Sequence, residues 1–502
     1  MGSSMDHHDV IIVGAGISGV SQAVHLQKHC PGKSFVMLEG RSAIGGTWDL
    51  FRYPGIRSDS DMHTLGFSFK PWTEAKSIAD GPSILKYVNE TVDEFGLREK
   101  ILLGHRVKQA HWSSSESRWL VTIEKSDGSR IEMSCGFITM CGGYYNYDEP
   151  HDAQLKNLDS FRGQVVHPQF WPKDLDFVGK RVLVVGSGAT AMTLVPNMAD
   201  NGAHVTMLQR SPTYVASRSD QDGFANFLRK MLPDNWAYSI TRFKNTKLQS
   251  YFYKRTRVAP AMVKRRLLNE LRKWFDDDYI AEHFTPKYNP WDQRMCLIPN
   301  ADLYKAIKRG DAVVRTELID SFVEKGVRLQ SGEVLTADII VTATGLKLSV
   351  LSGVDFFVDN QHINVPDTFS YKGMMLSSVP NMLQTFGYIN ASWTLRADLN
   401  SEYLCRLLNH MDQTGMSKVT PTLREEDEGM EARPWIENFP SGYMMRSMHL
   451  FPRQGEGPWR NTQDFNADKK MVREGPIEDS ALRFSKPVIN QVSVPTKDTE
   501  AA

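Results

Sequence analysis

Two short apolar stretches, each followed at once by a glycine-rich turn, constrain the fold of this chain more than any other feature. Val10–Val13 precedes GAGISG, and Val182–Val185 precedes GSGATA. A helical pattern and a further apolar stretch follow the first turn, and the second copy repeats the arrangement, with Phe35–Leu38 and Val205–Leu208 as the later stretches. Each copy therefore predicts two parallel strands joined by a helix that starts at the turn.

The first turn has the residues of a dinucleotide site. Its first glycine permits the tight bend, its second lets backbone approach a pyrophosphate, and its third brings the helix against the sheet. Gly14, Gly16 and Gly19 hold these positions, and Glu39 ends the next strand, where a carboxylate accepts the hydroxyls of an adenosine ribose. We predict that this turn binds FAD; a structural turn without a ligand is the alternative.

The second turn differs at the end of its second strand. The positions that keep the turn geometry are Gly186, Gly188 and Ala191. Gln209 and Arg210 stand where an acid would select NADH, and a guanidinium there can bind a 2′-phosphate. With Ser211 and Thr213 as helpers, this pocket is predicted to bind NADPH. A solvent-exposed Arg210 without a ligand is the alternative.

The two units indicate an α/β fold with two Rossmann-like dinucleotide-binding domains, for FAD and NADPH, and a helical insertion. An apolar meander separates the units, and a long stretch of helical character follows the second. We predict an FAD domain split into 5–150 and 346–490, an NADPH domain split into 151–219 and 291–345, a helical insertion at 220–290 and a disordered tail at 491–502.

The amino-acid composition limits the kinds of partner that this chain is expected to bind. Lys plus Arg and Asp plus Glu are equal at 59 each, so no global charge favours nucleic acid, and none is expected as a partner. The five cysteines, Cys30, Cys135, Cys141, Cys296 and Cys405, form no CxxC pair and no metal-ligand spacing. We therefore expect no metal, a cytoplasmic setting and dioxygen rather than a disulfide as the electron acceptor. No apolar run approaches the roughly 18 residues that span a bilayer.

One segment is strongly basic. Residues 241–274 carry eleven Lys or Arg and one acid, interleaved with aromatic and aliphatic side chains. This pattern favours a solvated lid, and peripheral contact with an anionic membrane surface is the alternative.

Two further motifs point to one family. FRGQVVHPQFWP contains Phe161, Gly163, His167 and Trp171 in the pattern FxGxxxHxxxW, and GGTWDLFRYPGIRSD runs from Gly45 to Asp59. These stretches resemble the two signatures of the type I Baeyer-Villiger monooxygenases, and the resemblance extends from Asp9 to about Trp459. YPGIRSDSDM and PWDQRMCLIPNADLY most resemble the ethionamide-activating branch.

The resemblance implies a reaction. In this family NADPH reduces FAD, dioxygen adds at the flavin C4a carbon, and the resulting peroxide converts a ketone to an ester or lactone or oxygenates a sulfide. It also implies that Trp48 lies at the FAD and that Arg294 supplies the positive charge that the peroxide needs. Asp59 would hold Arg294, with Asp61 as its rival. Relatives often carry Lys where this chain has Gln293, so the NADPH preference depends more on Arg210.

Roles for the remaining residues follow from their positions. Phe161 and Trp171 are interpreted as anchors, Gly163 as a pliable point and His167 as a hydrogen-bonding clasp that changes partners as the NADPH domain moves. A rigid linker, or His167 as a general base, are the alternatives. The resemblance places the loop 387–399 at the flavin, and the side chains predicted to line the substrate pocket are Trp393, Thr394 and Leu395, with core packing as the alternative.

Two other functions remain open from the sequence. One is a flavin-containing monooxygenase restricted to S- or N-oxygenation, and the other is a non-catalytic, NADPH-responsive flavoprotein.

Overall fold

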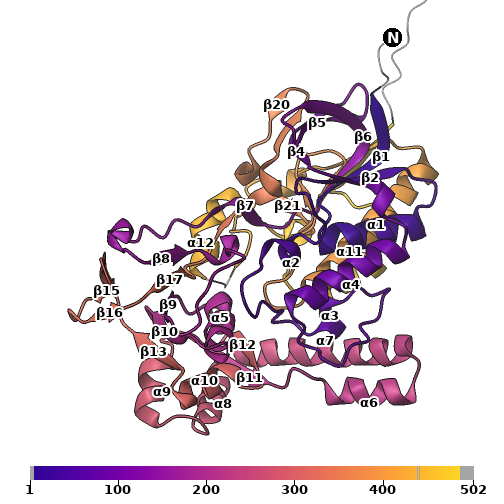
Figure 1. Ribbon diagram of the computed structural model, residues 1–502. Coiled ribbons are helices and arrows are strands. Elements are labelled where there is room, and N and C mark those ends of the chain that lie inside the picture. Colours follow the sequence, from indigo (N-terminus) through magenta and orange to yellow (C-terminus); the bar gives the residue numbers. More distant parts are fainter. Residues whose placement is uncertain (1–4, 438, 440, 487–502) are drawn as a thin grey trace, which may run out of the picture.

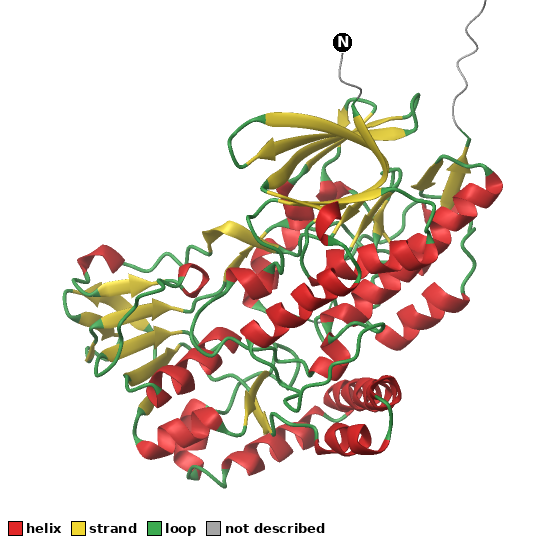
Figure 2. Cartoon of the chain, turned by 45° about the vertical axis from the view of Figure 1, so that its right-hand side comes forward, coloured by secondary structure: helices red, strands yellow, loops and turns green. Residues whose placement is uncertain are grey.

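Two separate sheets, the larger mixed and the smaller parallel, organise the chain, and helices pack on each (Figures 1 and 2). The computed structural model describes residues 5–437, 439 and 441–486. The predicted fold class, an α/β chain with two dinucleotide-binding domains, is confirmed. The tail predicted at 491–502 lies outside the described residues.

The larger sheet contains the first glycine-rich turn. From edge to edge its strands are β20 (Gln361–His362), β19 (Asp355–Val358), β4 (His105–Ser113), β5 (Arg118–Lys125), β6 (Arg130–Met140), β1 (Asp6–Val13), β2 (Phe35–Glu39) and β3 (Ile101–Leu103), and β23 (Met382–Gln384) pairs with β6. The strands β1, β2, β3, β6 and β23 run parallel, whereas β4, β5 and β6 form an antiparallel meander. The turn therefore lies at the carboxyl end of a central strand, β1.

Burial explains why β1 is central. Val10–Val13 are at most 6 % exposed, as expected for a parallel strand covered on both faces. Helix α1 (Ile17–His29) follows the turn and packs against α11 (Trp393–Thr414). A Cβ on Gly19 would overlap the carbonyl oxygen of Gly14, so only glycine lets α1 begin this close to the strand.

The smaller sheet contains the second turn. Its five parallel strands, in order, are β13 (Ala312–Thr316), β10 (His204–Gln209), β9 (Arg181–Val185), β17 (Ile339–Thr342) and β8 (Gln164–Val166). Helix α5 (Ala189–Asp200) follows the turn after β9, and α10 (Asp302–Arg309) packs against α5. A three-stranded sheet at its side consists of β14 (Ile319–Val323), β15 (Gly326–Leu329) and β16 (Val334–Thr336).

The chain crosses between the two sheets twice, and the two crossings pair. The outward crossing is β7 (Tyr145–Pro150) and the return is β18 (Leu346–Leu348), and they form an antiparallel ribbon with Leu346 opposite Pro150. This ribbon connects the two domains, so each crossing restrains the other.

Four helices lie between residues 223 and 283. They are α6 (Gly223–Met231), α7 (Asp234–Val258), α8 (Pro260–Leu271) and α9 (Asp277–His283). The strands that flank them, β11 (Val215–Arg218) and β12 (Cys296–Pro299), pair with each other, so both ends of the helical segment leave the smaller domain at one place. Helix α7 also lies against the larger domain, where Tyr238 donates to the carbonyl of Phe67 (2.9 Å) and Arg242 to Asp398 (3.1 Å).

The remaining elements cover the larger domain and its carboxyl-terminal part. The helices are α2 (Thr47–Leu50), α3 (Met62–Leu65), α4 (Gly81–Glu94), α12 (Gly442–Ser447) and α13 (Phe465–Glu474). Two short antiparallel pairs are β21 (Ser370–Tyr371) with β22 (Met375–Leu376), and β24 (Lys418–Pro421) with β25 (Leu482–Ser485). The 3₁₀ turns are η1 (Arg98–Lys100), η2 (Leu158–Ser160), η3 (Pro168–Phe170), η4 (Val350–Gly353), η5 (Val365–Asp367), η6 (Glu425–Asp427), η7 (Met448–Leu450) and η8 (Gly457–Trp459). Within the described residues, no helix combines the length and apolar character that a membrane span requires.

Two ion pairs join the same two helices, α11 and α13, at different depths. Arg396 and Asp468 pair at 2 % and 1 % side-chain exposure, whereas Arg473 and Glu402 pair at 42 % and 22 %. Tyr388 also donates to Asp468 (2.8 Å). The inner pair satisfies two charges that water cannot reach.

We predict that Arg396→Leu lowers the free energy of unfolding by about 3–5 kcal/mol, because it leaves the Asp468 carboxylate buried and unpaired. The matched variant Arg473→Leu should cost at most about 1 kcal/mol, since its ion pair is open to solvent. Urea unfolding of the flavin-bound protein, followed by circular dichroism, measures both values. Equal losses from the two variants would contradict this account.

Candidate active site

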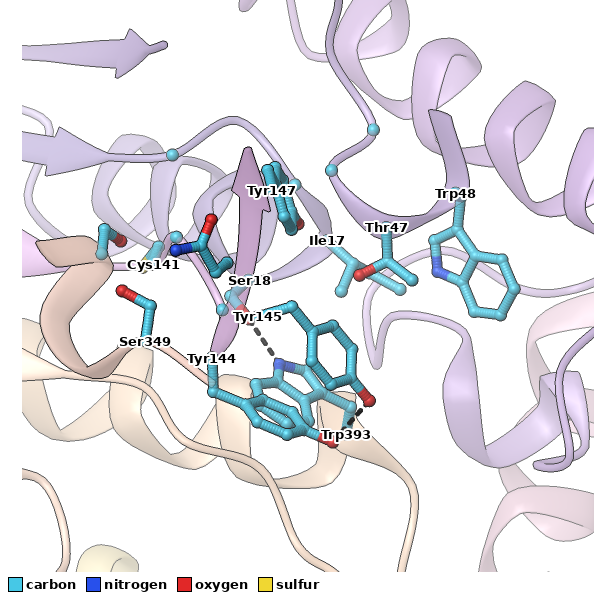
Figure 3. Close-up of a pocket in the computed structure, with 18 of the residues that line it drawn as sticks. Ile17, Ser18, Thr47, Trp48, Cys141, Tyr144, Tyr145, Tyr147, Ser349 and Trp393 are labelled. Atoms are coloured by element: carbon cyan, nitrogen blue, oxygen red, sulfur yellow. Dashed lines mark hydrogen bonds between the residues drawn. The ribbon is translucent and has the colours of Figure 1, made fainter. Parts of the chain in front are cut away.

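One cavity of about 510 Å³ is lined by the first glycine-rich turn, by the start of the helix that follows the second turn, and by loops from both domains (Figure 3). On the larger domain its wall includes Gly14, Gly16 and Glu39. On the smaller domain it includes Ala189 and Thr193 at the start of α5. The start of α5 thus reaches the cavity of the first turn, whereas Gly186 and Gly188 are not part of its lining.

The first turn leaves room for phosphate and no room for side chains. Gly14 has a φ of 105°, and a Cβ on it would come within 2.9 Å of the Cys141 backbone. Gly16 caps α1 without a side-chain cap, so free amides point toward the cavity. A Cβ on Gly46, from the GGTWDL motif, would lie 3.3 Å from the Cα of Gly16. The two glycine backbones form a cradle that suits a pyrophosphate.

Glu39 ends β2 at the rim of this cradle and is 6 % exposed. One carboxylate oxygen accepts from the amide of Ala15 and the other from that of Arg41, both at 2.9 Å. Burial raises the pKa of Glu39, and these amides offset part of the effect. Each oxygen retains a second lone pair, so the carboxylate can still accept ribose hydroxyls. Trp48, at the start of α2, lines the same cavity.

Arg294 and Asp59 meet at the centre of the cavity wall. Nη2 of Arg294 lies 3.7 Å from Oδ2 of Asp59, and the side chains are 41 % and 17 % exposed. Both line the cavity. Burial raises the pKa of Asp59, and the charges of Arg294 and Arg57 counter that rise. Burial alone would lower the pKa of Arg294, but the negative charge of Asp59 outweighs it and raises the pKa, so the guanidinium stays charged.

Asp61, the rival of Asp59, is engaged elsewhere. It accepts from Asn245 Nδ2 at 3.0 Å and from the hydroxyl of Thr64 at 3.1 Å. Burial alone would raise the pKa of Asp61, but the neighbouring His63 ring, the charge of Arg218 and the hydrogen bond from Asn245 lower it to about 2. Asp61 therefore connects α3 to α7, and Asp59 is the carboxylate next to Arg294.

The second turn repeats the cradle on the smaller domain. Gly186 has a φ of 136°, and a Cβ on it would overlap the carbonyl oxygen of Ala343. Gly188 caps α5 without a side-chain cap, and a Cβ built on it meets nothing within 4 Å. Ala191 is fully buried and lets α5 pack on the sheet. The open space at Gly188 suits the pyrophosphate of a second nucleotide.

At the end of β10, the two residues expected to select the nucleotide differ in their surroundings. Gln209 is 1 % exposed, and its amide donates to the carbonyl of His283 and the hydroxyl of Thr316, both at 2.8 Å. Gln209 therefore holds α9 to the sheet and does not face a nucleotide. Arg210 and Ser211 are exposed. The Arg210 side chain has no carboxylate partner among the described residues.

Comparison with known proteins supports a single family. A profile of the flavin-binding monooxygenase-like family matches residues 7–391. The FAD-containing monooxygenase EthA of Mycobacterium tuberculosis is 49 % identical over 484 residues, which are 96 % of this chain and 98 % of EthA. The probable FAD-binding monooxygenase AlmA of Acinetobacter baylyi is 46 % identical over 482 residues, 96 % of each chain.

The chain belongs to the flavin-binding monooxygenase-like family. Among solved structures, an NADP-bound steroid monooxygenase superposes with a TM-score of 0.77 at 21 % identity, over 96 % of this chain and 100 % of that one. An ε-caprolactone-bound cyclohexanone monooxygenase superposes with a TM-score of 0.73 at 20 % identity, over the same shares. These likenesses show that this monooxygenase shares their fold, and the resemblance inferred from its motifs is confirmed.

Several aromatic side chains that the sequence did not single out line the cavity of this monooxygenase. The Tyr144 ring stacks on Trp393 at 5.3 Å, and its hydroxyl lies 2.8 Å from that of Tyr145 (Figure 3). Tyr443, from α12, completes the wall beside Arg294. Tyr144 and Tyr145 lie just after β6, close in sequence to the first domain's strands, whereas Tyr443 reaches the site from a distant segment.

The three predicted substrate-pocket residues lie in different places. Trp393 lines the cavity and donates from Nε1 to Ser18 Oγ at 2.7 Å. Thr394 is fully buried, and its hydroxyl donates to the carbonyls of Thr64 (2.9 Å) and Leu65 (2.8 Å). Leu395 is buried and lines a neighbouring cavity. Of the three, Trp393 alone faces the cavity of the glycine turns.

A thiol also stands on the cavity wall. Cys141 follows β6, and its Sγ lies 3.7 Å from the side-chain oxygen of Gln22. Burial raises the pKa of Cys141 to about 12, so this sulfur is protonated at neutral pH.

The FxGxxxHxxxW segment runs along β8 and η3 beside both crossings. Phe161 is buried among Leu183 and Phe322, and Trp171 packs on the core of the smaller domain. Nδ1 of His167 accepts from the amide of Gln169 (3.2 Å), whose side chain donates to the carbonyl of Asn146 in β7 (2.9 Å). Burial lowers the pKa of His167, which keeps the ring neutral.

Gly163 lies in a tightly packed contact. Its φ is not in the left-handed region, but a Cβ there would come within 2.5 Å of the carbonyl oxygen of Asp338 and would overlap the Phe161 ring. Gly163 thus makes a close contact between β8 and its neighbours, and its role as a pliable point stays a prediction.

We predict that Gly163→Ala lowers the free energy of unfolding by about 1–3 kcal/mol, because the added methyl group overpacks this contact. Gly32→Ala is the control, since its Cβ would meet nothing within 4 Å and its φ is not positive. That variant should stay within about 0.5 kcal/mol of the parent. Urea unfolding compares them, and an unchanged Gly163→Ala protein would contradict the overpacking argument.

Proposed function

We propose that the chain is an FAD- and NADPH-dependent Baeyer-Villiger monooxygenase that converts ketones to esters or lactones and also oxygenates sulfides. The observation that carries the proposal is the Arg294–Asp59 pair in a cavity lined by the first glycine-rich turn and by the start of α5. The reduced state expected of the cysteines suits a cytoplasmic site of action.

The first turn, Gly46 and Glu39 would hold FAD, and the second turn would hold NADPH. When bound, reduced FAD supplies the activated oxygen atom from dioxygen. Arg294 places a fixed positive charge where negative charge develops on the carbonyl oxygen of the ketone as the new C–O bond forms. Asp59 restrains the guanidinium and sets its orientation. The rings of Tyr144, Tyr145 and Trp393 exclude water from the reacting atoms.

Purified protein given NADPH, dioxygen, a simple ketone and a thioether tests the function. We expect an ester from the ketone and a sulfoxide from the thioether. Replacing Arg294 with Ala should lower ester formation by roughly 10²–10³-fold in kcat, because the developing charge loses its partner, while bound FAD absorbance is unchanged.

The alternatives predict other products. Sulfoxide or N-oxide without an ester from any ketone would assign the chain to S- or N-oxygenation alone. NADPH oxidation that no substrate stimulates, and that Arg294→Ala leaves unchanged, would indicate a non-catalytic flavoprotein. A parallel Asp61→Asn variant serves as the control, because Asp61 is engaged with Asn245 and Thr64 rather than with Arg294.

We further propose that Arg210 and Arg446 together bind the 2′-phosphate of NADPH. Arg446 lies on α12, and its guanidinium packs at Gly345, just beyond β17. Burial and the charge of Arg210 lower the pKa of Arg446. The described residues provide neither guanidinium with a carboxylate, so two like charges lie near one another at the carboxyl end of the smaller sheet. A phosphate dianion would relieve their repulsion.

Arg210→Ala and Arg446→Ala should each raise KM for NADPH roughly tenfold to hundredfold while KM for NADH changes little, because a charge-assisted bond contributes about 1.5–3 kcal/mol. Steady-state kinetics with both nucleotides measures the effect. Arg460→Ala is the control, since this arginine lines a different cavity. An equal effect on both nucleotides from Arg446→Ala would remove that residue from the phosphate site.

A further inference from the structure

The helical segment exposes more apolar surface than any other part of the described chain. The described residues include 22 large apolar side chains that are exposed, and 11 of these lie between residues 224 and 262. On α6 they are Phe224, Phe227 and Met231, which recur at helical spacing on one face. Monomeric proteins rarely leave such a concentration uncovered without a binding role.

Helix α7 continues this surface. Trp236, Ile240, Phe243, Tyr251 and Val258 are exposed, and their separations of three, four, seven and eight residues place them on one side of the helix. The opposite side contacts the larger domain. Helices α6 and α7 lie side by side along the lower edge of the molecule in Figure 1. We call these eight exposed apolar side chains, three on α6 and five on α7, the docking face.

Positive charge lies within the docking face. Lys230, Lys247, Lys254 and Arg255 have no carboxylate partner among the residues that the structure describes. Of the acids nearby, Asp222 pairs with Lys244, and Asp234 begins α7. The whole chain has equal numbers of acidic and basic residues, so this charge is local.

We propose that the docking face binds an anionic lipid bilayer peripherally. Aromatic and aliphatic side chains would enter the interface, and the lysines would lie among the lipid headgroups, the arrangement expected of an interfacial amphipathic helix. A second copy of this chain fits less well, because a two-fold contact would place the same uncompensated cations opposite one another. The sequence favoured a solvated lid, and the exposure of the aromatic side chains favours the bilayer.

The position of α7 relates the proposed lipid contact to the cavity that contains Arg294. A cavity of about 390 Å³ is lined by Thr246, Ser250 and Tyr253 of α7 on the side next to the docking face. It shares Ile389 and Ala391 with the cavity that holds Arg294. A substrate carried at the bilayer surface would therefore enter beside the helix that touches the lipid and pass toward the reaction site.

Flotation of the flavin-bound protein with lipid vesicles tests the proposal without relying on its chemistry. Vesicles of equal parts phosphatidylcholine and phosphatidylglycerol should carry the protein upward, and vesicles of phosphatidylcholine alone should carry much less. Lys230→Glu combined with Lys247→Glu should reduce binding to the anionic vesicles roughly tenfold or more. Lys325→Glu combined with Arg328→Glu, on the smaller domain, should leave it unchanged.

A matched apolar pair completes the test. Val258→Ser, at 77 % exposure on the docking face, should weaken vesicle binding, whereas Val178→Ser, at 66 % exposure on the smaller domain, should not. Equal losses from both members of either pair, or no flotation of the parent protein, would overturn the proposal. So would sedimentation velocity showing a dimer that Val258→Ser dissociates. Oxygenation without vesicles should be the same in all four variants, so failure here is separable from failure of the proposed function.

Discussion

The antiparallel pairing of β7 with β18 brings the carboxyl ends of two parallel sheets to one cavity. Each sheet alone would bind a nucleotide at its own glycine turn, as many parallel sheets do. Because the two crossings are hydrogen-bonded to each other, the domains cannot separate freely, and both helix amino ends face the space where Arg294 lies. The FxGxxxHxxxW segment contacts β7 through Gln169 and Asn146, which explains why the motif sits between the two nucleotide turns.

The pKa values of the ionisable side chains in the cavity depend on burial as much as on neighbouring charges. Asp59 and Arg294 are close enough to influence each other but too far apart for a tight salt bridge. The guanidinium therefore keeps donors that are not committed to Asp59 and can face the cavity. The surrounding tyrosines, whose pKa values are raised chiefly by burial, stay neutral and contribute shape rather than charge.

Local sequence predicted those features that depend on neighbouring residues. The strand-turn-helix units, the glycine positions and the fold class follow from periodicity and from the few residues that tight turns permit. Features that depend on contacts between segments far apart in the sequence were not predicted. Gln209 and Thr394 look like site residues by position, yet the carbonyls that engage them belong to remote segments. Tyr443 and Arg446 reach the site from a helix with no recognisable motif.

The burial of the Cys141 thiol affects how well the protein resists oxidation. An oxygen-activating centre endangers any sulfur beside it, since thiolates are oxidised far more readily than thiols. Here the sulfur is kept in its less reactive form by its apolar surroundings, without a disulfide or a metal. Loss of the surrounding packing would bring the pKa of Cys141 back toward its ordinary value and make this sulfur easier to oxidise.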